Sequence, residues 1–346
     1  MTIGGCMNYK EILEKYPWIK EEKQKLIISP DSDGLLSALV YLNYFDAEVV
    51  GYYDGKVMLS KENVDPKDCL FLDMDVYNKN IKSIGHHMVC YNKNKLPNNW
   101  YNYDNCIQIN NLRNFDKTKD FQRKYPFATI HFLLALLSNV KEIKLSDNAI
   151  IPLLFSDGVW TVLFGYTENC LDWFDFLHVK EKDNILNPIF CGNHSFLTIM
   201  EKINDFLRKR DELNCKCTYD LKKDEYVYKN RSRTGDKLII SNSKGEPVNI
   251  KLINNNYDII EQEQGRVKLF ITFLAELMGF KPYLDKWNFN NLKLREFTKG
   301  ILDGKGEHKV LNQKNYIDIV ENKCFSMAIT SSQAIEYTID DRNHFN

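Results

Sequence analysis

The chain has 346 residues, of which 44% are hydrophobic and 27% are charged, and its formal net charge is −1. This is the composition of an ordinary globular protein, and the length favours two domains over one. The near-zero charge excludes a globally basic surface of the kind that marks many nucleic-acid-binding proteins, and it leaves room only for a local basic groove.

The sequence shows no feature of export or membrane insertion. Residues 1–10 lack a basic region followed by an apolar core, and no apolar run approaches the ~18 residues of a membrane helix. The nine cysteines are scattered, and several lie in apolar runs, which is typical of reduced thiols. We therefore expect a cytoplasmic protein with no membrane partner.

The N-terminal half is predicted to contain helices and strands in alternation. Residues 9–25 have the spacing of an amphipathic helix interrupted near Pro17. The apolar run 26–28 precedes an Asp-x-Asp-Gly turn and then apolar residues at helical spacing, which predicts strand, turn and helix. A long, partly irregular loop is expected at 92–120. Further strands are expected at 47–53, 68–75, 81–84 and 149–155, and a buried helix at 128–140.

Strands separated by helices or short connections predict an α/β fold. We expect a mostly parallel sheet with helices on both faces, followed by a smaller C-terminal α/β domain. The first domain is placed at 1–195, a linker helix at 196–220 and the second domain at 221–346. In the second domain, strands are expected at 225–228, 237–241, 248–252, 257–260 and 326–330, and a helix at 267–278.

Carboxylates follow several of the predicted strands. Asp31 and Asp33 lie in the turn after the first strand, Asp73 and Asp75 end the run 68–75, and Asp157 follows the run 149–155. Open α/β sheets bind ligands at the carboxyl ends of their strands. We therefore expect these side chains to converge, with Asp73 favoured over Asp75 because Asp73 directly ends its apolar run.

Two adjacent histidines, His86 and His87, follow the strand at 81–84. Carboxylate oxygens with one or two imidazoles suit Mn²⁺ or Mg²⁺, and two such ions favour the hydrolysis of a phosphate ester. His87 is expected to bind either metal or phosphate. The predicted metal ligands are Asp31, Asp33, Asp73, Asp75, His86 and Asp157.

Taken together, these motifs resemble those of the DHH phosphoesterase superfamily, and most closely its RecJ-like branch. The order of the motifs along residues 25–160 matches the family. The matching segments are Asp31-Ser32-Asp33-Gly34-Leu35-Leu36-Ser37, Phe71-Leu72-Asp73, Gly85-His86-His87 and Phe155-Ser156-Asp157-Gly158.

The resemblance implies a hydrolase domain with two Mn²⁺ ions, followed by a smaller substrate-binding domain. The chain departs from the family at Gly85, where the family has aspartate, and at Ile27, where several branches have histidine. The first departure removes a carboxylate that orients the histidines, and the second predicts a leaner metal site. The implied catalytic residues are Asp31, Asp33, Asp73, His86, His87 and Asp157.

Four further residues are candidates for substrate contact. Ser37 is either a helix cap or a phosphate ligand, and Arg231 and Arg233 either clamp phosphate or form a solvated basic loop. His308 ends a segment, 303–308, that resembles a degenerate form of the Gly-rich phosphate-binding segment in the family's C-terminal domain.

The sequence therefore predicts a Mn²⁺-dependent phosphodiesterase acting on nucleotides. A RecJ-like substrate would be single-stranded nucleic acid, held by backbone charge and base stacking. The near-neutral charge makes a small or cyclic oligonucleotide an alternative. A further alternative belongs to a different functional class: a catalytically impaired nucleotide-binding module with this fold. Ile27 and Gly85 are the residues that support it.

Overall fold

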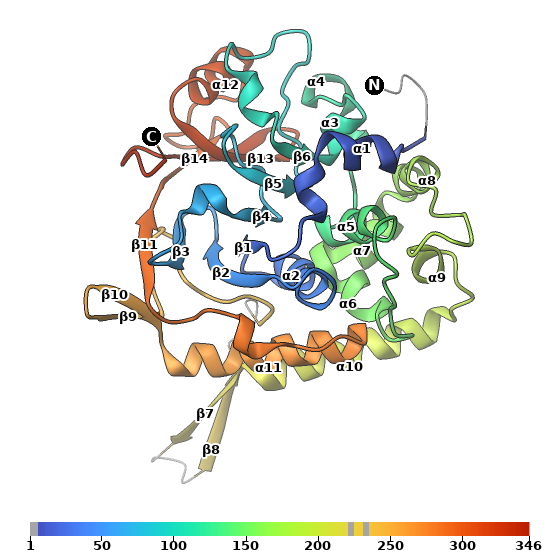
Figure 1. Ribbon diagram of the computed structural model, residues 1–346, viewed down its shortest axis with the longest axis vertical. Coiled ribbons are helices and arrows are strands. Elements are labelled where there is room, and N and C mark those ends of the chain that lie inside the picture. The colour runs from blue at the N-terminus through green and yellow to red at the C-terminus, as the bar shows by residue number, and fades with distance from the viewer. Residues whose placement is uncertain (1–5, 221–224, 231–234, 346) are drawn as a thin grey trace.

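The computed structural model describes residues 6–220, 225–230 and 235–345 (Figure 1). Within these residues the chain is an α/β protein with a nine-stranded mixed sheet, a three-stranded sheet and a two-stranded hairpin. The helices are α1 Tyr9–Lys15, α2 Ser32–Tyr44, α3 Ile109–Leu112, α4 Lys117–Asp120, α5 Thr129–Leu137, α6 Ile150–Phe155, α7 Val159–Gly165, α8 Thr167–Phe176, α9 Asn187–Phe190, α10 Phe196–Asn214, α11 Glu261–Met278 and α12 Gln313–Val320. The strands are β1 Lys25–Ile28, β2 Glu48–Tyr53, β3 Val57–Lys61, β4 Leu70–Leu72, β5 Lys82–Gly85, β6 Cys106–Gln108, β7 Cys215–Asp220, β8 Glu225–Asn230, β9 Ile250–Ile253, β10 Asn256–Ile259, β11 Leu292–Glu296, β12 Thr298–Leu302, β13 Cys324–Ser331 and β14 Ala334–Ile339.

The strand pairing of the large sheet changes from parallel to antiparallel at β2. Its strand order is β6-β5-β4-β1-β2-β3-β11-β10-β9. The strands from β6 to β2 are parallel, and every pairing from β2 to β9 is antiparallel. The expected mostly parallel sheet is thus parallel in one half only. Because β2 and β4 lie on opposite sides of β1, the strand order reverses at β1, which is the kind of position where such sheets bind ligands.

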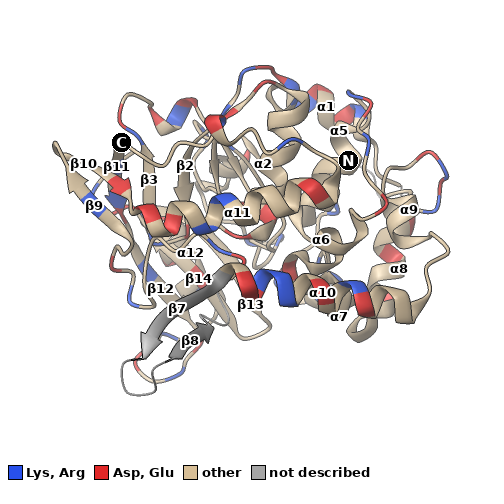
Figure 2. Cartoon of the chain, turned by 90° about the horizontal axis from the view of Figure 1, so that it is seen from below, with Lys and Arg blue, Asp and Glu red and all other residues tan. Residues whose placement is uncertain are grey.

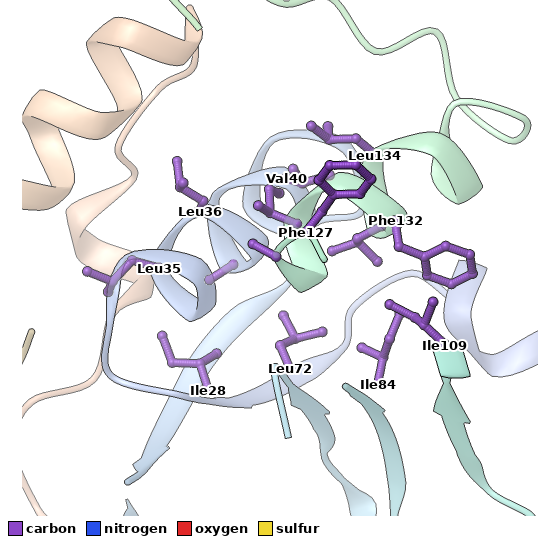
Figure 3. Packing of buried hydrophobic residues seen from close by; sticks show 14 of the residues in the cluster. Ile28, Leu35, Leu36, Val40, Leu72, Ile84, Ile109, Phe127, Phe132 and Leu134 are labelled. Atoms are coloured by element: carbon purple, nitrogen blue, oxygen red, sulfur yellow. The ribbon is translucent and has the colours of Figure 1, made fainter. Parts of the chain in front are cut away.

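One face of the parallel half packs against helices. Ile28, Leu72 and Ile84 from adjacent strands meet Leu36 of α2 and Phe132 of α5 in a single buried cluster (Figure 3). These side chains are fully buried, and each contributes about 1.5–3 kcal/mol by leaving water. The apolar spacing after the Asp-x-Asp-Gly turn therefore predicted helix α2, which is buried on all sides from Ser32 to Leu42.

The other face of the same strands is covered by the C-terminal region. Ile27, Val50 and Phe71 belong to a second buried cluster that includes Phe297 and Phe325. The Phe71 and Phe325 rings lie edge to face, with centroids 6.3 Å apart. The expectation of helices on both faces is therefore wrong for β1, β2 and β4, whose second face packs against C-terminal residues that include Phe325 of β13.

Several predicted elements differ in the structure. The run 149–155, predicted as a strand, is helix α6, since periodicity alone does not separate a short buried helix from a strand. Residues 237–241 form no strand beyond an isolated bridge at Ser241, and the loop expected at 92–120 contains β6, α3 and α4. The domain boundaries stay a prediction, although β9, β10 and β11, from the predicted second domain, belong to the sheet that contains β1.

Of the described helices, no single one is long and apolar enough to cross a bilayer. Only Ile150–Gly165 and Thr167–Phe176 taken together pass the test of length and composition, across a bend of 111°. Acidic and basic residues are interspersed along α10 and α11 (Figure 2).

Candidate metal centre

The candidate site lies where the adjacent strands β1, β4 and β5 end. Asp33 stands in the first turn of α2, just after β1, while Asp73 follows β4 and His86 follows β5. The pairing of β1 with β4 and of β4 with β5 brings these three chain segments side by side. The convergence expected from the sequence is therefore present.

The Asp33 carboxylate joins two helices. It is fully buried and accepts hydrogen bonds from the backbone N–H groups of Thr129 and Ile130, at 2.7 and 2.8 Å. These groups belong to the first turn of α5, where helix amides have no partner within the helix. The N-terminus of α5 therefore holds the Asp33 carboxylate in place and stabilises its negative charge.

A chain of hydrogen bonds orients His86. The Thr129 hydroxyl donates to Asp73 Oδ1 at 2.9 Å and lies 2.9 Å from His86 Nδ1. Because its only hydrogen goes to Asp73, its oxygen accepts from a protonated Nδ1. The Nε2 atom is then left with a lone pair, and it lies 3.3 Å from Asp157 Oδ2. With the Thr129 hydrogen on Asp73, this network favours the tautomer in which Nε2 is available as a ligand.

Asp73 and Asp157 both have left-handed backbone conformations, with φ of 60° and 51°. Such angles are uncommon outside glycine, although aspartate tolerates them better than most residues, and they cluster at functional sites. Asp157 lies in the 3₁₀ turn Ser156–Gly158, between α6 and α7. A tight turn after a helix therefore supplies the fourth member of the cluster, where the sequence predicted a strand end.

The ligand atoms of these side chains lie close enough together to share a metal ion. Asp73, His86 and His87 form one group, and Asp33, His86 and Asp157 form another, with the ligand atoms of each group within 4.8 Å of one another. Of the two His86 nitrogens, Nε2 faces Asp157 Oδ2 at 3.3 Å, whereas Nδ1 lies 3.3 Å from Asp73 Oδ1 and 3.7 Å from Asp33 Oδ2. Carboxylate oxygens with imidazole nitrogens form a donor set that suits divalent cations.

The electrostatics of the cluster also fit a cation. Burial, together with neighbouring carboxylates, raises the pKa of Asp33 and of Asp73 well above the usual range. Burial likewise raises the pKa of Asp157, against the opposing effect of His86. Among the described residues, the His86 imidazole is the one basic side chain within 4 Å of these three carboxylates, and it is charged only when protonated on both nitrogens. A bound cation would supply the positive charge that this group lacks.

Asp31, Asp75 and His87 surround this cluster in different ways. Asp31 caps α2, accepting from the Gly34 N–H at 3.3 Å, and belongs to neither ligand group. Asp75 is buried and accepts from the His87 N–H at 3.1 Å. Burial raises the pKa of Asp75 to about 7. The His87 side chain is 44% exposed and belongs to a ligand group that excludes Asp75, so the structure brings the preferred Asp73 rather than Asp75 to the ligand atoms.

A cleft of about 320 Å³ opens over the cluster, between the large sheet and the three-stranded sheet. Asp73, His87 and Asp157 line it from one side, and Lys299 of β12 and Tyr337 of β14 from the other. Lys299 and Tyr337 also line a neighbouring cavity of about 440 Å³ that contains His308. The two spaces therefore share a wall at β12 and β14.

Of the residues predicted to contact substrate, the two that the structure describes, Ser37 and His308, do not line the cleft over the carboxylate cluster. Ser37 is fully buried within α2, and its hydroxyl has no hydrogen-bond partner among the described residues. A contact with substrate at Ser37 therefore does not fit this structure. His308 pairs with Asp303 at 3.0 Å in the neighbouring cavity, away from the carboxylates. Arg231 and Arg233 lie outside the described residues.

Two residues near the site were not predicted from the sequence. Thr129 belongs to no recognisable motif and contributes through its position at the start of α5. Lys237 lies in a loop, and its Nζ atom is 3.9 Å from Asp31 Oδ2. The Leu238 N–H donates to the Pro30 carbonyl at 2.7 Å, which fastens this loop to the β1–α2 turn. Only the tertiary fold reveals either neighbour.

A scan against protein-family models found no match, and comparisons with the curated proteins and with the solved structures found none either.

Proposed function

We propose that the chain is a phosphodiesterase that depends on a divalent metal and hydrolyses nucleotide phosphodiester bonds. The observation that supports it most strongly is the joint placement of Asp33, Asp73, Asp157 and His86. Of these residues, Asp73 and Asp157 line a cleft that also has lysines on its walls. When bound, divalent ions at such a site supply Lewis acidity toward water and phosphoryl oxygens. Mn²⁺ is our preferred ion, and Mg²⁺ suits the same oxygen ligands.

The chain's own residues would divide the remaining tasks. Lys237 and Lys299 line the cleft, where Lys237 lies 3.9 Å from Asp31 Oδ2 and Lys299 pairs with Glu336. Both ammonium groups would also bind phosphate oxygens that enter the cleft. His87 faces the same space with a partly exposed ring and is able to contact either metal or phosphate. Asp33 and Asp73 are held by α5 and by Thr129, so that their geometry is set before any substrate arrives.

A short or cyclic oligonucleotide is the substrate that the surface favours. The net charge is −1, and α10 and α11 carry interspersed charges rather than a continuous basic track for a phosphate backbone. Binding of a long strand would release many counterions and weaken steeply with salt. We therefore expect a shallow salt dependence and a preference for short substrates over long single strands.

The test is hydrolysis of a linear dinucleotide, a cyclic dinucleotide and a single-stranded oligonucleotide, each with Mn²⁺ and with EDTA. We expect Mn²⁺-dependent cleavage that falls to background in Asp33→Asn and Asp157→Asn. The exposed Asp318 of α12 provides a matched control, since Asp318→Asn changes the same functional group outside the site. A wild-type chain that binds nucleotides with Mn²⁺ and cleaves none of them would instead identify a non-catalytic binding module.

A further inference from the structure

A further cavity opens beside the carboxylate cluster. It has a volume of about 420 Å³ and shares Asp31, Asp157 and Lys237 with the cleft described above. The volume lies within the range of sites that hold small organic molecules. A ligand with a phosphate at the cluster would therefore have adjoining space for a second chemical group.

The walls of this cavity are largely apolar. Phe155 and Trp160 approach from α6 and α7, and Ile203 and Leu207 from α10. The Trp160 indole is partly exposed and stacks on Phe196, with ring centroids 5.7 Å apart and planes at 28°. This packing supports a flat aromatic surface next to the site before any ligand binds.

Polar and charged groups also line the same cavity. Asp236 and Thr161 line it, as do Lys237 and Arg210, and the Arg210 guanidinium lies over the Phe155 ring at 5.6 Å. A lining that combines apolar and aromatic side chains with polar ones suits a planar heterocycle, since its faces stack and its edges form hydrogen bonds. Lys237 lies between this cavity and the cleft, where a phosphate attached to such a heterocycle would be placed.

We propose that the pocket lined by Phe155, Trp160, Ile203 and Leu207, here called the Trp160 pocket, binds the nucleobase of the nucleotide whose phosphate lies at the carboxylate cluster. The proposal rests on the proposed function, because it assigns a ligand to the space next to the same site. Recognition is by stacking, which accepts any base because every base has a π-face. The pocket would hold one base, in keeping with a short substrate or a chain end.

The test uses a mononucleotide, which contains no phosphodiester bond, so that binding is read without turnover. The probe is the 5′-monophosphate of 2-aminopurine riboside, whose fluorescence falls on stacking, and ribose 5-phosphate is the control without a base. With Mn²⁺ present, Trp160→Ala is expected to weaken the nucleotide's affinity by roughly 5- to 100-fold. The affinity for ribose 5-phosphate, measured by calorimetry, should not change.

Leu207→Trp provides a second variant, because it fills the pocket instead of emptying it and should also weaken nucleotide binding alone. Tyr101→Ala removes a partly exposed aromatic ring outside the Trp160 pocket and serves as the matched control. Equal affinities of the wild-type chain for the nucleotide and ribose 5-phosphate would overturn the proposal, as would affinities in both pocket variants within twofold of wild type. Base-dependent binding without hydrolysis of any dinucleotide would overturn the proposed function and leave the pocket assignment standing.

Discussion

Gly85 lies directly against the carboxyl group of Asp75. A Cβ atom on Gly85 would come within 2.4 Å of Asp75 Oδ1 and 2.6 Å of Asp75 Cγ, far closer than atoms can pack. The same carboxylate accepts from the His87 N–H. Where the resembling family has an aspartate in its histidine motif, this chain places a carboxylate from a neighbouring strand end against the same position. Gly85 and Asp75 therefore form a matched pair.

Moving the carboxylate from position 75 to position 85 tests whether the two residues depend on each other. Asp75→Ala removes the carboxylate that holds the His87 backbone, and Gly85→Asp forces a side chain into occupied space. Each single change is expected to weaken Mn²⁺ affinity by about 10-fold or more, as loss of supporting groups around metal ligands does. The double variant Asp75→Ala/Gly85→Asp restores a carboxylate without the clash, and calorimetry should show tighter Mn²⁺ binding than in either single variant. A double variant that binds no better than the singles would refute the pairing.

Asp73→Asn should separate metal binding from stability. Asparagine tolerates the left-handed backbone at this position and still accepts from Thr129, while it removes one charge from a crowded cluster. Because the pKa of Asp73 is higher in the folded chain than in the unfolded chain, ionisation of Asp73 lowers the free energy of unfolding as pH rises. Removing this charge should therefore stabilise the fold most at neutral and alkaline pH. In EDTA we expect Tm to rise by roughly 2 °C.

The same variant should lose most of the stabilisation that Mn²⁺ gives the wild-type chain, because a ligand that binds only the folded state raises its Tm. Asp73→Ala is the comparison, since alanine at φ of 60° is strained and leaves Thr129 without its acceptor. If Asp73→Asn destabilised the metal-free chain as much as Asp73→Ala, the account of charge crowding would be wrong.

The hydroxyl of Thr129 is predicted to set the tautomer of His86. Thr129→Val keeps the shape of the side chain and the backbone bond to Asp33, but removes the link between His86 and Asp73. Mn²⁺ affinity should fall by about 10-fold. Thr129→Ser retains the hydroxyl and should stay near the wild-type value. Equal affinities of the valine and serine variants, by calorimetry, would exclude this role.

The sequence predicted the local part of the site better than its surroundings. The strand, turn and helix around Asp31 and Asp33 are confirmed, because the alternation of an apolar run, an Asp-Gly turn and helical spacing is encoded in consecutive residues. The convergence of Asp33, Asp73 and His86 followed from the rule that parallel strands end at the same edge. Their chemical role stays a prediction.

What the sequence did not predict depends on long-range packing. Thr129 and Lys237 reach the site through the docking of α5 and of a loop, and no motif marks either one. The run before Asp157 was predicted as a strand because buried strands and short buried helices have the same composition. Phe325 covers the second face of the sheet, where helices were expected. The sequence did not predict this, because strand residues buried on both faces do not indicate what covers them.

Acid sensitivity should arise in part from His131 of α5, which is fully buried. Burial lowers its pKa to about 4, whereas an unfolded histidine titrates near 6.5. Below pH 6.5 the unfolded chain binds the additional proton, so stability falls as pH drops toward 4. At pH 5 the loss from this residue is about 2 kcal/mol.

His131→Gln should reduce that loss, because glutamine does not titrate. At this position in the first turn of α5, the glutamine side chain is also able to accept the hydrogen bond that the Ala128 N–H now donates to His131 Nδ1. The measurement is urea unfolding of the metal-free chain at pH 7 and pH 5. The difference in unfolding free energy between the two pH values should be smaller in the variant, and the exposed control His194→Gln should leave it unchanged. The same difference in His131→Gln and wild type would remove His131 as a cause.

The central claim is that Asp33, Asp73, His86 and Asp157 hold divalent metal. It is tested most directly by anomalous X-ray scattering at the manganese absorption edge from crystals of the full chain grown with Mn²⁺. We predict at least one strong peak within coordination distance of His86 and of at least two of the three carboxylates, and its loss in His86→Ala. Manganese peaks confined to surface carboxylates, with none at the cluster, would contradict the account.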